Sequence, residues 1–359
     1  MKADILIVGA GMAGASLAAE LAPHASVLLL EAEDHPGYHS TGRSAAFWSE
    51  TYGGPGVQPL TTASAAFLRE HGFLGERRGL HLADRTGVAA LDAMAEEFAG
   101  RVTLERLDRA GIERWVPGAR PAWVEALLEP TCADIEVAAL HAFYLASARR
   151  SGAVLATGAR AGAASRDGGR WRIDTPAGGF EAELIVDAAG AWADPVARLA
   201  EAAPLGIQPY RRTVVQVAVS PPARAGMPLV VDILGRFYFK PEAGGRIWVS
   251  PHDETPCEAS DCAAEELDVA VAVDRLETAV DWRVERVERR WAGLRSFAPD
   301  RLPVYGFDPA RPGFFWFAGQ GGFGIQTAPA AARLAAALIL GREPEIDPSP
   351  YRPERFRLG

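Results

Sequence analysis

Three segments at the start of the chain differ in hydrophobic pattern and together predict a compact β-α-β unit. The apolar run "DILIVG" at 4–9 predicts a buried strand, and "MAGASLAAELA" at 12–22 predicts a helix. A second apolar run, "SVLLLEAE" at 26–33, predicts another strand. Because two parallel strands need a crossover between them, the helix is the expected connection.

The rest of the pattern alternates between helix-rich and strand-rich stretches. Residues 170–175 and 179–190 predict a hairpin that leads into a buried strand, and 206–294 reads mostly as strands. Residues 313–340 predict a strand, a glycine-rich turn and a long helix. The other helices are predicted at 88–100, at 133–155, where a helix leads into a strand, at 192–203 and at 264–279.

The turn between the first strand and helix reads "GAGMAG" and places Gly9, Gly11 and Gly14 at the GxGxxG spacing. The first glycine permits the tight turn, the second lets the backbone approach a pyrophosphate, and the third lets the helix pack on the strand. Glu31 ends the next strand about twenty residues later, where a carboxylate accepts hydrogen bonds from a ribose diol. These four positions predict a dinucleotide-binding site.

A second glycine-rich segment indicates which dinucleotide is bound. The fingerprint fits FAD or NAD, but it lies at the extreme N-terminus, as is usual in FAD proteins. "GQGGFGIQT" at 319–327 lies between a predicted strand and a predicted helix. A helix N-terminus aimed at the flavin would stabilise negative charge on the reduced ring. We therefore predict FAD.

The strand-rich block interrupts the α/β stretches, so we predict two domains that are interleaved in sequence. The expected fold class is α/β: a Rossmann-like FAD-binding domain with a β-rich substrate domain. A chain of 359 residues is long enough for both. The predicted division assigns 1–75, 135–205 and 296–345 to the FAD-binding domain, 76–134 and 206–295 to the substrate-binding domain, and 346–359 to a C-terminal tail.

Composition restricts the partners. A formal net charge of -9 argues against nucleic acid. Cys132, Cys257 and Cys262 have neither metal-ligand nor disulfide spacing, and the histidines match no metal pattern, so we expect no metal and a cytoplasmic location. Lys2 and the apolar run after it suggest a signal peptide, but Asp4 and the glycine spacing favour the nucleotide turn. No apolar run reaches the roughly 18 residues that suggest a membrane span.

The stretch "GYHSTGRSAAFWSETYG" at 37–53 holds more hydroxyl and small residues than a connecting loop needs. It occurs in order with "DILIVGAGMAGASLAAEL", "VDAAGAW", "WAGLRSFAPD" and "GFFWFAGQGGFGIQT". Together these motifs resemble the D-amino acid oxidase (DAO) family of flavoproteins, in the branch that contains FAD-dependent D-amino acid and D-arginine dehydrogenases. The resemblance spans nearly the whole chain.

The resemblance implies further contacts with the cofactor. No cysteine lies in the family's C-terminal flavin-attachment region, so the FAD is expected to be non-covalent. Besides the fingerprint, the implied cofactor-binding residues are Arg43, Ser44, Ala45, Ala189, Gly190, Trp192, Gly321, Gly322, Gly324, Ile325, Gln326 and Thr327.

It also implies a substrate site. Arg295 matches the arginine that holds the substrate carboxylate, and Tyr52 matches a tyrosine on the loop that closes the pocket. Arg211 stands beside Arg212, so the sequence leaves open which of the two faces the site. The implied catalytic residues are Arg295, Arg212, Tyr238 and Tyr52, and the implied pocket residues are Phe47, Leu80, Gly322 and Gln326.

This residue set suits oxidation of an amino acid. An arginine can grip a carboxylate through two charge-assisted hydrogen bonds, and a tyrosine hydroxyl can add a third contact. That grip would place the Cα–H bond over the flavin, and positioning is much of what such an enzyme supplies. Loss of hydride from Cα gives an imine, which water converts to a 2-oxo acid and ammonia. The sequence identifies no general base.

Two departures from the arginine-specific relatives bear on the substrate. Those relatives have an acid where this chain is expected to have Leu80, and a histidine where it has Phe47. A cationic side chain facing Leu80 would be buried without a partner, which costs several kcal/mol. Apolar side chains are therefore expected, although Glu50 could return an acid to this region and the alignment near Leu80 crosses a length change.

We expect an FAD-dependent D-amino acid dehydrogenase that forms 2-oxo acids and ammonia, with reaction as an oxidase left open. The electron acceptor is unknown, with a quinone or respiratory chain among the candidates. Within the same superfamily, the alternatives are a sarcosine- or glycine-type amine oxidase and a 2-hydroxy acid dehydrogenase. The alternative of another class is a non-catalytic flavin-binding redox sensor.

Overall fold

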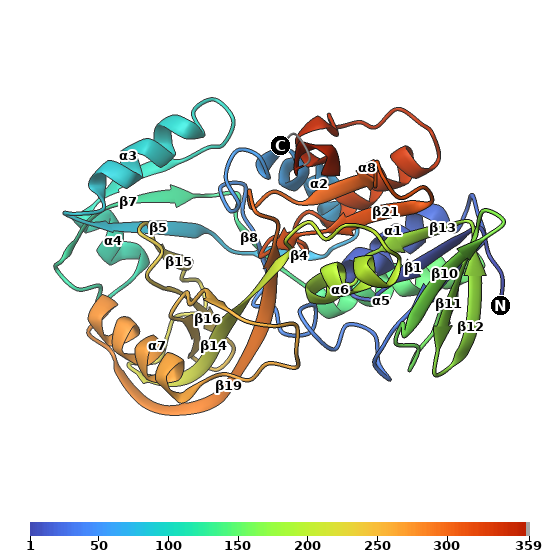
Figure 1. Ribbon diagram of the computed structural model, residues 1–359. Coiled ribbons are helices and arrows are strands. Elements are labelled where there is room, and N and C mark those ends of the chain that lie inside the picture. The colour runs from blue at the N-terminus through green and yellow to red at the C-terminus, as the bar shows by residue number, and fades with distance from the viewer. Residues whose placement is uncertain (357–359) are drawn as a thin grey trace.

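The computed structural model describes residues 1–356 and places the predicted β-α-β unit in the middle of a six-stranded sheet. The unit consists of β1 (Ile5–Val8), α1 (Met12–Leu21) and β2 (Val27–Leu30). The strand order is β20-β21-β13-β1-β2-β9, parallel except for β20 at one edge. Strands β21, β13 and β1 are labelled on the right of Figure 1. The other strands are β9 (Val154–Ala156), β13 (Leu184–Asp187), β20 (Val304–Phe307) and β21 (Phe314–Ala318).

Alternation along β1 buries both faces of this sheet. Ile5 and Ile7 pack into a core shared with α1, α5 and α8, whereas Leu6 and Val8 pack into a core shared with α6 and a small antiparallel sheet. A strand that is apolar on both faces is expected where layers cover a parallel sheet from either side. The covering elements are α5 (Val137–Arg150), α6 (Ala193–Leu199), α8 (Ala328–Ile339), β10 (Ala163–Asp167), β11 (Arg170–Thr175) and β12 (Gly178–Ala182).

A ten-stranded sheet forms the other half of the molecule, drawn on the left of Figure 1. Its main path is β22-β19-β14-β17-β16-β15-β5-β7-β6, and β18 pairs with β14. The pair β5–β15 is parallel and joins segments that are far apart in sequence. The strands are β5 (Gly79–Asp84), β6 (Glu105–Asp108), β7 (Trp123–Glu129), β14 (Gln208–Ser220), β15 (Leu229–Asp232), β16 (Tyr238–Glu242), β17 (Arg246–Ser250), β18 (Thr255–Pro256), β19 (Arg283–Phe297) and β22 (Gln320–Gly321).

The two faces of this sheet differ. One face packs its apolar residues, such as Val215 and Ile247, against α4 (Arg109–Trp115) and α7 (Glu266–Ala279). The other face carries Tyr238, which packs with residues of the loop after β2. The chain between the two sheets forms β3 (Phe47–Trp48), α2 (Gln58–Glu70), β4 (Leu74–Glu76), α3 (Val88–Glu97) and β8 (Ala133–Ile135). Three short 3₁₀ turns are η1 (Gly190–Trp192), η2 (Ser349–Tyr351) and η3 (Pro353–Phe356).

The predicted α/β class is confirmed, with a parallel sheet beside a β-rich region. Several predicted elements are longer than those observed. The second strand ends at Leu30, the helix predicted over 88–100 ends at Glu97, and the helix predicted over 192–203 ends at Leu199. Glu201 has a φ of 53°, a left-handed conformation that cannot continue a helix. The division into domains stays a prediction, and residues 357–359 of the predicted tail lie outside the described residues.

Candidate functional site

A cavity of about 310 Å³ lies beyond the carboxyl ends of β1 and β2. Its wall includes Gly9 and Glu31 from the β-α-β unit and Arg212 and Arg295 from the ten-stranded sheet. Ligands of open α/β sheets bind at this edge, where the strand order reverses. The predicted site residues that line the cavity are Gly9, Gly11, Glu31, Arg43, Ser44, Ala45, Ala189, Gly190, Trp192, Arg212, Arg295, Gly321, Gly322, Gly324 and Ile325.

The glycine turn leaves no room for side chains. Gly9 has a φ of 100°, and a Cβ there would lie 2.5 Å from the carbonyl oxygen of Ala188. Gly14 does not line the cavity; a Cβ there would lie 1.8 Å from the carbonyl oxygen of Gly9. The first glycine therefore allows the turn, and Gly14 allows α1 to approach β1.

Glu31 is held in place by backbone donors. Its two carboxylate oxygens accept hydrogen bonds from the N–H groups of Ala10 at 3.1 Å and Glu33 at 3.0 Å. The residue is 8% exposed and lines the cavity just after β2. The carboxylate is thus fixed where a ribose diol of a dinucleotide would meet it.

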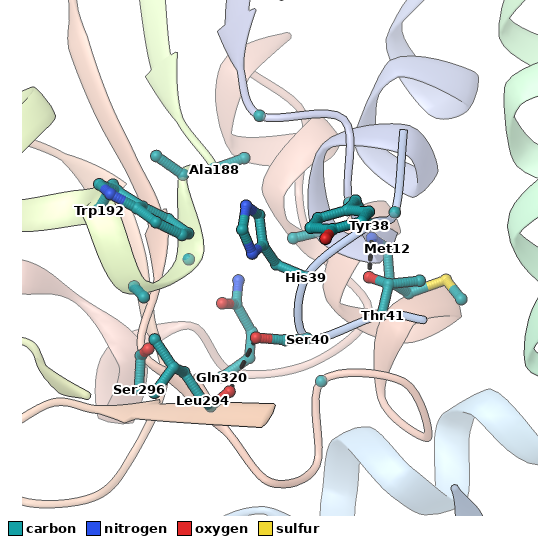
Figure 2. A pocket seen from close by; sticks show the side chains of 18 of the residues that line it. Met12, Tyr38, His39, Ser40, Thr41, Ala188, Trp192, Leu294, Ser296 and Gln320 are labelled. Atoms are coloured by element: carbon teal, nitrogen blue, oxygen red, sulfur yellow. Dashed lines mark hydrogen bonds between the residues drawn. The ribbon is translucent and has the colours of Figure 1, made fainter. Parts of the chain in front are cut away.

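The loop after β2 folds over the start of α1 (Figure 2). The Thr41 Oγ1 accepts a hydrogen bond from the N–H of Met12 at 2.9 Å, and the Ser40 hydroxyl donates to the carbonyl of Leu294 at 2.8 Å. Thr41 was not predicted as a site residue, although a hydroxyl here can cap the helix. The rings of His39 and Trp192, both at the cavity wall, pack against each other with centroids 4.6 Å apart and an interplanar angle of 52°.

Arg43 lines the cavity, but its guanidinium is engaged elsewhere. It forms an ion pair with Asp261 and donates to the carbonyl of Cys262 at 2.8 Å. Asp261 also accepts from the Tyr38 hydroxyl at 3.0 Å. Arg43 therefore fastens the loop after β2 to the segment before α7, rather than offering a free charge to a ligand.

Two residues of the second glycine-rich segment lie behind the cavity wall. Gln326 was predicted to contact both cofactor and substrate, but its side chain accepts from the N–H of Ser49 and donates to the carbonyl of Tyr52. The Thr327 hydroxyl donates to the carbonyl of Phe323. Both residues are 1% exposed and neither lines this cavity, so their side chains do not offer the predicted contacts there, and Gln326 instead fixes the loop that carries Tyr52.

Arg212 and Arg295 lie on the paired strands β14 and β19 and both face the cavity. Arg211 points away and forms ion pairs with Glu265 and Asp268, so Arg212 is the residue of the pair at the site. Arg212 Nε donates to the carbonyl of Asp253 at 2.6 Å.

Three polar atoms at this end of the cavity are buried without a hydrogen-bond partner among the described residues. They are the Nη1 atoms of Arg212 and Arg295 and the hydroxyl of Tyr238. Buried polar groups are nearly always paired in folded proteins, so three such atoms together indicate a place for a ligand.

The charges here favour an anion. Burial, together with the charge of Arg295, lowers the pKa of Arg212 to about 10. Burial raises the pKa of Tyr238, but the charges of Arg295 and Arg212 outweigh it and the pKa is lowered overall. A carboxylate between the two guanidinium groups would relieve their repulsion and satisfy their free N–H groups.

A second cavity of about 150 Å³ lies beside Tyr52 and Tyr238. Phe47 packs against Tyr52 and Tyr238, with ring centroids 5.2 and 6.3 Å apart. The wall is largely apolar and includes several polar side chains. Its side-chain lining is Phe47, Ser49, Thr51, Tyr52, His81, Met94, Leu229, Val231, Asp232, Ile233, Tyr238 and His252.

The prediction that Leu80 lines this pocket is wrong. Side chains alternate along β5, so Leu80 points into the core under α4 and α7, and His81 faces the cavity. Phe47 does line the cavity, as predicted. The carboxylate of Glu50 accepts from the hydroxyls of Thr62 and Thr131 and does not reach the cavity.

The acids around the second cavity are already paired. Glu129 is fully buried and accepts from the hydroxyls of Ser49 at 2.9 Å and Thr51 at 2.7 Å, with His81 Nε2 at 3.6 Å. Asp232 is bound by the guanidinium of Arg236. A cationic side chain entering this cavity would therefore find no carboxylate free to receive it.

None of the helices within residues 1–356 is long and apolar enough to cross a bilayer. In the same range, no three His, Cys, Asp or Glu side chains gather in a way that could hold a metal ion.

Comparison with known proteins places these features in context. A family model described as FAD dependent oxidoreductase (DAO) matches residues 4–338. A glycine oxidase of Pseudomonas aeruginosa is 33% identical over 196 residues, which is 52% of this chain and 50% of that protein. The chain thus spans about half the length of this relative in the match.

Two solved structures share the fold over nearly all of both chains. Glycine oxidase from Geobacillus kaustophilus is 25% identical with a TM-score of 0.86, covering 98% of each chain. L-Proline dehydrogenase from P. horikoshii is 21% identical with a TM-score of 0.88, covering 99% of this chain and 98% of that one. The predicted two-domain flavoprotein fold is confirmed by these likenesses.

Proposed function

Since this chain belongs to the DAO family of FAD-dependent oxidoreductases, we propose that it oxidises D-amino acids with uncharged, mostly apolar side chains at the Cα–N bond. The products are 2-oxo acids and ammonia. The D configuration is supported by the motif "GYHSTGRSAA" and its companions, which resemble D-amino acid dehydrogenases.

The larger cavity suits FAD. Gly9 and Gly11 leave a side-chain-free approach to the N-terminus of α1, where a pyrophosphate is stabilised by backbone N–H groups. The fixed carboxylate of Glu31 suits the adenosine ribose. Gly322 lies between these elements and the arginines, and a Cβ there would lie 2.0 Å from the Tyr52 hydroxyl.

The observation that carries the proposal is the pair of arginines with free, buried Nη1 atoms beside the Tyr238 hydroxyl. The two cations bind the substrate carboxylate, and the Tyr238 hydroxyl donates a further hydrogen bond to it. This grip fixes the orientation of the Cα–H bond. FAD, when bound, supplies the hydride acceptor for that bond.

The second cavity supports the side-chain preference. Its volume of about 150 Å³ exceeds what glycine requires, and Phe47, Leu229 and Val231 form apolar walls. Such walls reward an apolar side chain by about 25 cal/mol per Å² buried. The carboxylates nearby are occupied by their own partners, so an incoming guanidinium or ammonium loses water and gains no ion pair.

A steady-state screen with an artificial dye acceptor tests the proposal. We expect D-leucine, D-methionine and D-phenylalanine to exceed D-arginine and D-lysine in kcat/KM, with the L-enantiomers as matched controls. A preference for D-arginine would contradict the pairing of the acids around the second cavity. Turnover of L-enantiomers only would contradict the assigned configuration.

A glycine- or sarcosine-type amine oxidase is the second candidate, because both glycine oxidases named above resemble this chain. Glycine and sarcosine belong in the same screen, and a clear preference for either would favour the amine oxidase.

We further propose that the reduced enzyme reacts slowly with oxygen, as a dehydrogenase does. Stopped-flow mixing with air-saturated buffer tests this, and rapid reoxidation with peroxide release would make it an oxidase.

A further inference from the structure

The proposed reaction assigns no role to His252, one of the residues that line the second cavity. His252 lies in the loop between β17 and β18 and lines this cavity next to Tyr238, with ring centroids 5.7 Å apart. The motif resemblance did not identify it, because it follows a strand end rather than a glycine turn.

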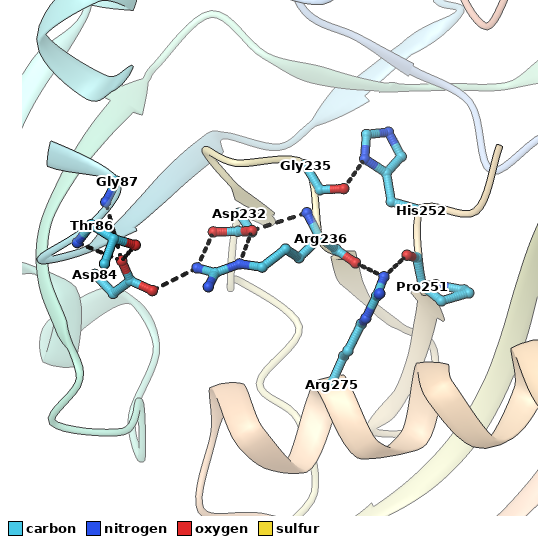
Figure 3. Close-up of polar contacts among 9 residues, drawn as sticks. All are labelled: Asp84, Thr86, Gly87, Asp232, Gly235, Arg236, Pro251, His252 and Arg275. Carbon is cyan, nitrogen blue, oxygen red and sulfur yellow. Dashed lines mark hydrogen bonds and ion pairs between the residues drawn. The ribbon is translucent and has the colours of Figure 1, made fainter. Parts of the chain in front are cut away.

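The two ring nitrogens of His252 have different surroundings (Figure 3). Nδ1 lies 2.7 Å from the carbonyl oxygen of Gly235. A carbonyl only accepts, so the proton must be on Nδ1, which leaves Nε2 as an unprotonated acceptor. Among residues 1–356, no group forms a hydrogen bond with Nε2.

The backbone holds this ring in place despite strain. His252 has a φ of 56°, which is uncommon for a residue with a side chain. Its N–H donates to Ser250 Oγ at 3.1 Å, Arg275 donates to the carbonyl of Pro251, and Arg212 Nε donates to the carbonyl of Asp253. Strained residues that their surroundings fix so firmly are concentrated at functional sites.

The imidazole stays neutral. Burial, followed by the positive charges of Arg212 and Arg295, lowers the pKa of His252 to about 3. The Nε2 lone pair is therefore available throughout the neutral pH range.

The other polar side chains of the second cavity are committed. Ser49, Thr51 and His81 face the buried Glu129, and Asp232 binds Arg236. Tyr52 and Tyr238 lie beside Arg295, where the substrate carboxylate belongs. His252 Nε2 is thus an uncommitted side-chain acceptor at the wall of this cavity.

We propose that His252 determines specificity by accepting a hydrogen bond from a neutral donor on the substrate side chain, such as a hydroxyl. This inference rests on the proposed function and narrows its substrate class. The apolar walls receive the hydrocarbon part of the side chain, and Nε2 receives an O–H or N–H at its end. A cationic donor would be excluded by the neighbouring arginine charges.

Three pairs of substrates that differ by one hydroxyl test the proposal on the unmutated enzyme. They are D-serine and D-alanine, D-threonine and D-valine, and D-tyrosine and D-phenylalanine. We expect the hydroxyl member of at least one pair to have the higher kcat/KM. A preference for the parent member in all three pairs overturns the proposal, whatever any variant does.

The variant His252→Asn sharpens the test. Asparagine tolerates the left-handed backbone, and its amide can replace Nδ1–H as donor to Gly235, but nothing replaces Nε2. We expect the hydroxyl-to-parent ratio of kcat/KM to fall about threefold to tenfold, the size of one neutral hydrogen bond. His71→Asn makes the same exchange at an exposed histidine that pairs with the Phe67 carbonyl and lines neither cavity, so it should keep the wild-type ratio.

The outcomes separate the two proposals. Turnover of the parent amino acids with an unchanged ratio in His252→Asn overturns the role of His252 and leaves the proposed function standing. Absence of turnover with every amino acid overturns both. Flavin absorbance and thermal unfolding of each variant show that the protein compared is folded and loaded.

Discussion

The two cavities of this molecule are built in different ways. At the nucleotide end of the larger cavity, the first β-α-β unit contributes glycines and a helix N-terminus, and Glu31 follows it directly. The smaller cavity is made by side chains from β3, β5, α3, β15 and β16 and from the loops that follow β3, β15 and β17. The first therefore depends on backbone shape within a short stretch of sequence, and the second on side chains that only the fold brings together.

The largest expected effect tests whether the nucleotide end of the larger cavity depends on backbone shape. Gly14→Ala places a methyl group 1.8 Å from the carbonyl oxygen of Gly9, so α1 must move away from β1. We expect loss of bound flavin and a destabilisation of about 3 kcal/mol or more. The ratio of flavin to protein absorbance and thermal unfolding measure the two effects.

Gly226→Ala is the matched control, because a Cβ there meets nothing within 4 Å. It should keep its flavin and its unfolding temperature. If Gly14→Ala also binds FAD normally, the nucleotide end is less dependent on backbone shape than the structure indicates.

A smaller effect is expected from a side chain. Arg295→Ala removes the charge-assisted hydrogen bonds that we propose to the substrate carboxylate. They are worth about 1.5–3 kcal/mol, so the variant should raise the KM roughly tenfold to 150-fold while flavin stays bound. Arg211→Ala removes a neighbouring arginine that points to Glu265 and Asp268 instead. Equal KM values for the two variants would move the carboxylate away from Arg295.

The smallest effect concerns pH. The pKa of Arg212 is about 10, lowered from its ordinary value by burial and by Arg295, so its charge is complete at neutral pH and is lost as pH rises through 10. We expect the affinity for 4-methylpentanoate, which is leucine without its amine, to be flat below about pH 9. Above pH 10 it should fall by up to tenfold per unit.

Titration of the flavin absorbance with this carboxylate measures the affinity at each pH. Because the ligand has no amine, its own charge is constant in this range. A decline that begins between pH 6 and 8 would assign the dominant charge to a different group.

The difference between the two cavities also explains which features could be predicted from the sequence. The β-α-β unit, both glycine-rich segments and Glu31 were predicted because each is encoded by neighbouring residues with a fixed spacing. The family and FAD were likewise predicted correctly. Arg295 and Phe47 were placed beside the cavities by their motifs, although their roles stay predictions.

The wrong or open predictions concern residues whose orientation is set by the tertiary structure. Leu80 and His81 are one residue apart, and a shift of one position along a strand exchanges the core face for the cavity face. The orientation of Arg212 rather than Arg211 depends on the same alternation. His252 could not be found in advance, because its neighbours Gly235 and Tyr238 come from other segments.

The parallel pairing of β5 with β15 has a consequence for the time course of folding. Leu80 pairs with Val230, so the chain between them must be present before this part of the sheet can close. Contacts of such long sequence separation form slowly. By contrast, β1, α1 and β2 are close together in sequence, so their contacts close only a short loop. We therefore expect the nucleotide turn to form early on a growing chain, and the walls of the second cavity to form last.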